Sequence, residues 1–216
     1  MTQEERLGDL TVAGYLERLG SDAPTPGGGA AGAISGATGA ALIAMVGRLT
    51  VDKAGFEGVV ERMRVLVERA DAARAGFLDL ADRDAHAFDG VMAAFKMPKG
   101  TDQETATRSA AIQAGYERAA SVPLEIARAA VELMKLADEA TAEGNPRAAS
   151  DGLSAAALLH TAALCAIANV EINAASLKDE GARAALLDEV DGLRERAERS
   201  IRESETAFQN RLGRSV

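Results

Sequence analysis

The chain has 216 residues, of which 47% are hydrophobic and only 3% aromatic, so its core must be built from Ala, Leu, Val, Ile and Met. Its 24 basic and 33 acidic residues give a net charge of −9, which argues against a nucleic-acid partner. A single cysteine excludes an internal disulfide, and the two histidines, His86 and His160, are too far apart in sequence to suggest a metal site. This length suits one domain spanning 1–216.

The first twenty residues predict a short helix rather than a secretory signal. They carry Glu4, Arg6 and Asp9 where a signal peptide has a basic start and an apolar run, so we expect a cytoplasmic protein. Asp9 or Thr11 can cap the helix VAGYLERL, which should stop at Gly20.

The segment from Pro24 to Leu49, PTPGGGAAGAISGATGAALIAMVGRL, has no charged residue between positions 30 and 47. Gly28, Gly32 and Gly36 recur every fourth residue and share one helical face, which lets a neighbouring helix approach closely. The run is just long enough to span a membrane, but Ala and Gly contribute little to insertion and no Trp or Tyr flanks it. We therefore predict a buried central helix and no membrane association.

The rest of the chain predicts more helices and shows no alternation typical of strands. The expected helices span about 56–97, 104–120, 123–143, 151–175 and 180–210. Ser121 and Pro123 either break the second of these or start the third, and Ser150 or Asp151 is a good cap for the fourth. The predicted fold class is all-α: an up-and-down helical bundle with long helices, two of them buried and rich in Ala and Gly.

Asp84 is the most informative single residue. A heptad-like apolar spacing that starts at Phe56 is interrupted only by Arg74 and Asp84. A carboxylate in such a seam is desolvated, which raises its pKa and suits a general acid or base near neutral pH. The alternatives are a salt bridge to a buried Arg or Lys, or a seam that turns outward here. Asp82 lies about 200° around the helix and is expected to be solvated.

Two further groups of polar residues have both a functional and a structural explanation. Asn169 and Asn173, one turn apart on an apolar helix, can hold a polar ligand or tie helices together. The glycines 27–29 precede a helix N-terminus, which favours an anion, although the same string is also a flexible entry.

The remaining candidate binding residues are three lysines and a second cluster of polar residues. Lys53, Lys96 and Lys99 stand at helix ends, where they can bind a carboxylate tail or be solvated. Three polar residues cluster between two helices: Asn145, Ser150 and Asp151. A role as helix cap would by itself explain Ser150 or Asp151.

Several motifs occur in one order between about Thr11 and Asn173: the PTPGGG segment, DRDAHAFDGVMAAFKMPK, ASVPLEIA, GNPRAASDG and NVEIN. Together they resemble the cyclodeaminase/cyclohydrolase family, which comprises the cyclodeaminase domain of formimidoyltransferase-cyclodeaminase and stand-alone methenyltetrahydrofolate cyclohydrolases. The resemblance implies an all-helical enzyme that acts on a tetrahydrofolate derivative as substrate, needs no metal or redox cofactor, and assembles as a homodimer or larger homo-oligomer.

The resemblance implies one of two reactions. The first converts 5-formimidoyltetrahydrofolate to 5,10-methenyltetrahydrofolate and ammonia. The alternative hydrolyses 5,10-methenyltetrahydrofolate to 10-formyltetrahydrofolate. From its length we expect this chain to be the second domain alone, without a formimidoyltransferase domain, so a formimidoyl substrate is expected to arrive from another protein. A second alternative is a non-catalytic helical protein that binds folate or serves as a scaffold.

The resemblance also implies site residues. It locates the catalytic aspartate in ADRDAHAF, at Asp82 or Asp84, and the seam position favours Asp84. The implied substrate-binding residues are Gly27, Gly28, Gly29, Lys53, Asn145, Ser150, Asp151, Asn169 and Asn173. Two departures keep the non-catalytic alternative open: Ala30 stands where the family usually has Ser, and Lys53 stands alone, after Asp52, where relatives commonly have a basic pair.

Overall fold

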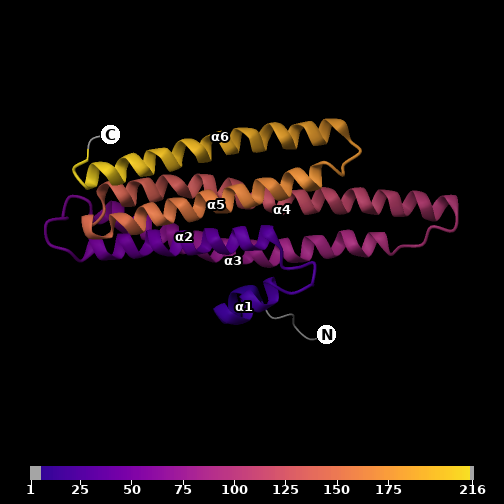
Figure 1. Cartoon of the computed structure of the whole chain (residues 1–216), viewed down its shortest axis with the longest axis horizontal. Helices are drawn as coiled ribbons and strands as arrows, with labels where there is room; N and C mark the ends of the chain where they lie inside the picture. Colours follow the sequence, from indigo (N-terminus) through magenta and orange to yellow (C-terminus); the bar gives the residue numbers. More distant parts are fainter. Residues whose placement is uncertain (1–5, 215–216) are drawn as a thin grey trace.

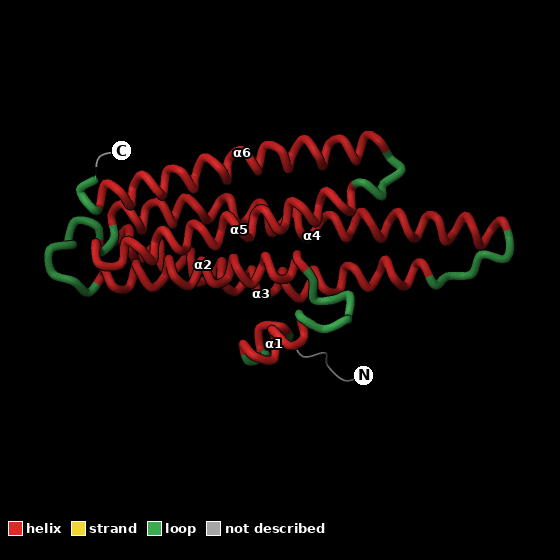
Figure 2. The backbone as a smooth tube through the Cα atoms, viewed as in Figure 1, coloured by secondary structure: helices red, strands yellow, loops and turns green. Residues whose placement is uncertain are grey.

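The computed structural model describes residues 6–214, and all regular structure in that range is helical. In chain order the elements are the 3-10 turn η1 (Leu7–Asp9), α1 (Val12–Leu19), α2 (Gly28–Val51), α3 (Val60–Phe95), α4 (Asp102–Glu143), the 3-10 turn η2 (Pro146–Ala148), α5 (Ala149–Ala174) and α6 (Glu180–Arg211). From α2 to α6 the chain runs up and down the long axis of the molecule, while α1 lies outside the bundle (Figure 1). The expected all-α bundle is confirmed, and the backbone of residues 6–214 contains no strand (Figure 2).

The two Ala/Gly-rich helices, α2 and α5, lie side by side within the bundle. Both are long and apolar enough to cross a membrane by length and composition alone, and 61% and 44% of their most apolar windows are buried in the bundle. A Cβ added at Gly36 would lie 2.8 Å from Cε1 of Phe77 on α3, closer than real Cβ contacts. The expected close approach of a neighbouring helix to the glycine face of α2 is therefore present.

Helix α4 is continuous from Asp102 to Glu143 and contains Pro123 in its interior, so the predicted break at Ser121 or Pro123 is wrong. A proline has no N–H to donate, and its ring crowds the carbonyl four residues earlier. Here that carbonyl, of Ala119, accepts a hydrogen bond of 2.9 Å from Nδ2 of Asn173 on α5. The helix continues because a side chain from elsewhere satisfies the buried acceptor.

Two other helix boundaries differ from expectation. Helix α3 begins at Val60 and ends at Phe95, a few residues inside the predicted limits. Helix α5 begins at Ala149 and has Ala148 as its N-cap without a side-chain hydrogen bond, so capping by Ser150 or Asp151 is wrong. The reason is that η2 runs directly into α5 and leaves no extended residue to act as a cap. At α1, by contrast, Thr11 accepts from the Gly14 N–H at 3.0 Å, as one of the two expected caps.

The charge-rich helix α6 packs on α4 and α5. It buries Val190 and Leu193, as its amphipathic spacing predicts. A carboxylate on α4 faces it: Asp138 accepts hydrogen bonds from the hydroxyls of Ser200, at 3.0 Å, and Ser204.

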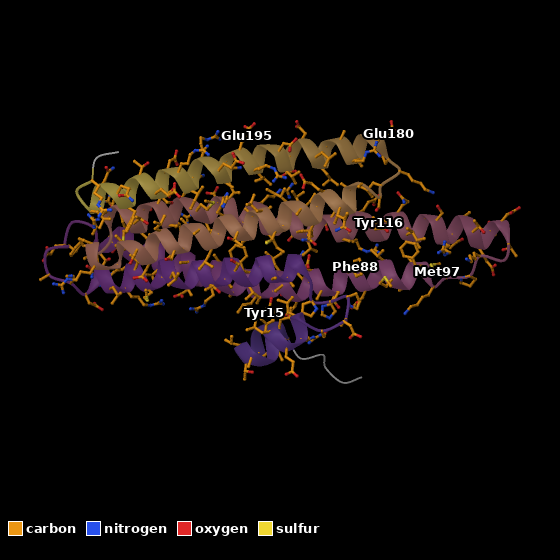
Figure 3. The ribbon with its side chains drawn as sticks, in the orientation of Figure 1. Tyr15, Phe88, Met97, Tyr116, Glu180 and Glu195 are labelled. Carbon is orange, nitrogen blue, oxygen red and sulfur yellow. The ribbon has the colours of Figure 1, made fainter. Side chains whose placement is uncertain are left out.

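Helices α3 and α4 extend beyond the start of α2 and the end of α5, so the bundle narrows there to a two-helix arm closed by residues 96–101 (Figure 1). Within the arm the ring of Phe95 meets Tyr116 edge-on, with centroids 6.4 Å apart. Figure 3 labels Phe88 on α3 and Tyr116 on α4 along this stretch. The step between bundle and arm is where the candidate site lies.

Candidate active site

A cavity of about 220 Å³ lies where α2 begins, α5 ends and the arm starts. Its wall comes from four helices and the loop before α2: Pro24, Thr25, Gly27, Gly28, Asp84, Phe88, Ala119, Asn169 and Asn173. Pockets that enclose a whole drug-sized ligand usually exceed about 300 Å³. This cavity would therefore take one end of a larger molecule.

The carboxylate of Asp84 rests against the first turn of α2. A Cβ added at Gly29 would lie 2.6 Å from Cγ of Asp84, so a larger residue at position 29 would displace this carboxylate. The backbone N–H of Ala30 donates a hydrogen bond to the carboxylate. The first N–H groups of a helix have no partner within it, and Asp84 supplies one from another helix.

Burial raises the pKa of Asp84 from its ordinary value of 3.8 to about 6, and the Ala30 N–H opposes that shift because it favours the charged form. No Lys or Arg within residues 6–214 forms an ion pair with Asp84, so the salt-bridge alternative does not describe this carboxylate. With a pKa of about 6, both protonation states are populated near neutral pH. This suits a group that both takes up and releases a proton.

Both asparagines line the cavity, but only Asn173 ties helices together, because Asn169 bonds within its own helix. Nδ2 of Asn173 donates to the carbonyl oxygens of Ala119, at 2.9 Å, and Asn169, at 2.8 Å. Nδ2 of Asn169 donates to the Cys165 carbonyl at 2.8 Å. Asn173 thus ties α5 to α4, and both side chains also line the cavity.

The glycine string forms the entry to α2. Gly27 is the N-cap residue, with an extended backbone, and Gly28 is the first helical residue. Both line the cavity, whereas Gly29 backs the Asp84 carboxylate. The helix N-terminus does hold an anionic group, as its dipole favours, but that group is the protein's own Asp84.

The remaining predicted binding residues lie at the other end of α2. Nζ of Lys53 donates to Oδ1 of Asn145 at 3.0 Å, and the Asn145 N–H donates to the Thr50 hydroxyl at 2.8 Å. Ser150 and Asp151 are in the first turn of α5, at this same end. Because α2 has 24 residues, its two ends are about 35 Å apart. One chain therefore does not bring these residues to the Asp84 cavity.

Asp82 is not solvated, contrary to expectation. Its Oδ2 accepts from Nε of Arg6 at 2.8 Å, and its Oδ1 accepts from the Leu7 N–H at 2.8 Å. Only 15% of the Asp82 side chain is exposed. Within the described chain, Asp82 thus holds the N-terminal segment on α3, while Asp84 faces the cavity.

Four wall residues were absent from the predicted site: Pro24, Thr25, Phe88 and Ala119. Phe88 was identified only as part of the apolar seam of its helix, and Ala119 was not singled out at all. A signal for Ala119 exists in the sequence, because Pro123 stands four residues later and frees its carbonyl. Lys96 and Lys99 lie at the exposed tip of the arm and do not line the cavity.

Comparisons with known proteins agree with this architecture. Residues 11–192 match the formiminotransferase-cyclodeaminase family. The chain is 40% identical over 190 residues to a methenyltetrahydrofolate cyclohydrolase of Methylorubrum extorquens, covering 86% of this chain and 89% of that protein. It is 36% identical to formimidoyltransferase-cyclodeaminase of Mus musculus, covering 82% of this chain but only 33% of that longer protein. The crystal structure of formiminotetrahydrofolate cyclodeaminase from Thermotoga maritima matches with a TM-score of 0.85 at 31% identity, covering 95% of this chain and 99% of that chain.

Proposed function

Since the chain belongs to the formiminotransferase-cyclodeaminase family, we propose that it is an enzyme that rearranges the one-carbon unit of a substituted tetrahydrofolate, with Asp84 as its general acid and base. The observation that carries this proposal is the position of Asp84: a partly buried carboxylate with a pKa of about 6 that faces a cavity beside two asparagines. Proton transfer of this kind contributes about 10²- to 10⁴-fold to an enzymatic rate.

In the cyclodeaminase reaction, N10 of 5-formimidoyltetrahydrofolate attacks the formimidoyl carbon and a new C–N bond forms. The ionised Asp84 takes the N10 proton and passes it to the imino nitrogen. A second proton, from solvent, then lets that nitrogen leave as ammonia, and the cationic 5,10-methenyl bridge remains. The tetrahedral carbon of the intermediate bears three nitrogens. The T. maritima relative, which this chain matches over 95% of its length, is a formiminotetrahydrofolate cyclodeaminase.

In the cyclohydrolase reaction, water adds to the cationic methenyl carbon and gives up a proton to Asp84. Asp84 passes this proton to N5, the C–N5 bond breaks, and the hydroxyl proton is released as the 10-formyl group forms. This second candidate is favoured by one observation: the M. extorquens relative, of similar length and 40% identical, is a methenyltetrahydrofolate cyclohydrolase. Both reactions are acid–base chemistry that one carboxyl group can perform without a redox cofactor.

The test follows the absorbance of 5,10-methenyltetrahydrofolate with purified protein. Faster decay than with the variant Asp84→Asn identifies a cyclohydrolase, and this variant also controls for spontaneous hydrolysis. Appearance of the absorbance from 5-formimidoyltetrahydrofolate, with release of ammonia, identifies a cyclodeaminase. If tetrahydrofolate binds and neither reaction occurs, the protein is the non-catalytic binder that Ala30 and the lone Lys53 left open.

We also propose that two copies of the chain associate through the outward sides of α2 and α5. Neither helix has a charged residue between positions 28 and 47 or between 152 and 170, so a second copy would bury this surface without desolvating charges. Thr38 and Thr161 are exposed on these two helices. We expect light scattering to give at least twice the monomer mass, and the double variant Thr38→Glu/Thr161→Glu to give the monomer. An unchanged mass in the variant would contradict this interface.

A further inference from the structure

We propose that Pro123 is a positioning residue: it frees the carbonyl that fixes Asn173, so that Asn173 presents a hydrogen-bond acceptor to the cavity and pairs with an N–H group of the substrate. This inference rests on the proposed function in one respect, because the N–H group belongs to a reduced folate. Its structural part concerns the free protein alone.

The first step is the backbone of α4. Residue 123 is buried in the middle of a 42-residue helix, where most residues would donate an N–H to the carbonyl of Ala119. Proline cannot donate, and among ordinary residues it is the least favourable in a helix interior. A residue with an N–H would make α4 more stable by itself. Helix stability therefore does not explain the proline, whereas the carbonyl that it frees has a defined use.

The second step is the side chain of Asn173. Its two amide hydrogens are both committed, one to Ala119 of α4 at 2.9 Å and one to Asn169 of its own helix at 2.8 Å. These two carbonyl oxygens fix the orientation of the Asn173 amide group. If the amide were flipped by 180°, its own oxygen would lie against both carbonyl oxygens and could not donate to them. Without the Ala119 carbonyl, only the local bond to Asn169 would remain.

The third step is what this leaves for a ligand. No donor within residues 6–214 hydrogen bonds to Oδ1 of Asn173, and Asn173 lines the cavity together with Asp84. An amide oxygen accepts and cannot donate. At this point of the wall, Oδ1 of Asn173 therefore favours an N–H group, which the reduced pterin ring offers, over a carbonyl or carboxylate oxygen.

The test is a double-mutant cycle with Pro123→Ala, Asn173→Ala and the double variant. We expect Pro123→Ala to keep or raise the melting temperature and to lower kcat/KM by about 3- to 10-fold, mainly through KM. Asn173→Ala should lower kcat/KM by about 10- to 50-fold. The double variant should match Asn173→Ala within about twofold, because Pro123 acts only through Asn173. Pro98→Ala, an exposed proline outside the cavity, is the matched control and should keep wild-type kinetics.

A second measurement needs no ligand. In NMR spectra of the free protein, the Nδ2 hydrogens of Asn173 should exchange slowly with solvent and should lose this protection in Pro123→Ala. Unchanged protection, or independent effects that multiply in the double variant, would overturn the inference. If the wild type neither turns over nor binds tetrahydrofolate while the protection still changes as expected, the positioning role stands and the proposed function fails.

Discussion

The two ends of α2 carry polar clusters that the family resemblance assigned to one binding site, yet they differ in what their hydrogen-bonding groups do. At the C-terminal end, Asn145 is buried and bonds only to protein: Oδ1 accepts from Lys53 and Arg147, and Nδ2 donates to Leu49. At the N-terminal end, Asp84 and Asn173 line a cavity, and no donor within residues 6–214 hydrogen bonds to Oδ1 of Asn173. A polar group that lines a cavity and has an acceptor without a protein partner is available to a ligand. The Asn145 cluster, whose hydrogen-bonding groups are all paired within the protein, instead connects elements of the fold.

The polar groups at the two ends of α2 also contribute to the free energy of folding with opposite signs. Each satisfied hydrogen bond of Asn145 contributes about 0.5–1.5 kcal/mol to folding. Asp84 is instead a net cost at neutral pH, because a carboxylate with a raised pKa is less stable when ionised in the folded protein than in the unfolded chain. A protein that retains such a cost gains something other than stability from it, and the following substitutions separate the two cases.

The largest effect is expected from Asp84→Asn. It should fold normally and lose turnover by about 10²- to 10⁴-fold, because an amide cannot exchange the proton. Steady-state rates at equal folded concentration measure this. Asp82→Asn is the matched control, expected to loosen the N-terminal segment and to keep turnover within about threefold. If Asp82→Asn were the inactive variant, the two aspartates would exchange roles.

Gly29→Ala should come next. The new Cβ would overlap the Asp84 carboxylate, so the side chain must move and kcat/KM should fall by about 10- to 100-fold. Gly76→Ala is a matched control on α3, because a Cβ there meets no atom within 4 Å and alanine favours a helix. Equal kinetics for the two variants would show that the contact between Gly29 and Asp84 is not needed.

At the other end of α2, Asn145→Ala should act on stability. Loss of its side-chain hydrogen bonds should lower the free energy of unfolding by about 1–3 kcal/mol, measured by urea denaturation, with unchanged activity per folded molecule. The opposite result, full stability with lost activity, would mean that this cluster completes a site on another copy of the chain.

The smallest effect is a pH dependence of stability. Because the pKa of Asp84 is raised in the folded state to about 6, its favourable contribution is present below pH 3.8 and is lost as the pH rises through 6. Asp84→Asn should therefore exceed the wild type in unfolding free energy by at most about 3 kcal/mol at pH 8, with the gain disappearing towards pH 4. Parallel stability curves over this range would contradict the raised pKa.

Local spacing was sufficient to predict most of the helices and the place of Asp84 in the apolar seam of α3. The four-residue glycine repeat of α2 and the apolar seam of α3 depend on neighbours within one or two turns, and both features have their expected partner in the packing of Gly36 on Phe77. The desolvation of Asp84 was predicted from the same seam, because a carboxylate among apolar positions must be desolvated or paired.

Features that depend on distant partners could not be predicted in this way. Helix α4 passes through Pro123 because Asn173, 54 residues from Ala119, satisfies the freed carbonyl. Asp82 is paired because Arg6, 76 residues away, folds back onto α3. The separation of Asn145 from Asp84 likewise depends on the length of α2, which the motifs alone do not reveal.

The projecting arm has a consequence for how the molecule moves through solvent. Helix α4, with 42 residues, is about 63 Å long. A sphere-like domain of this size has a radius of gyration of only about 17 Å, which is much less than half of that helix length. The chain will therefore experience more friction than a sphere of equal mass and will have an enlarged Stokes radius. Its retention on a gel-filtration column calibrated with globular standards will overstate its mass, so sedimentation velocity, which separates shape from mass, is the appropriate measurement of its assembly.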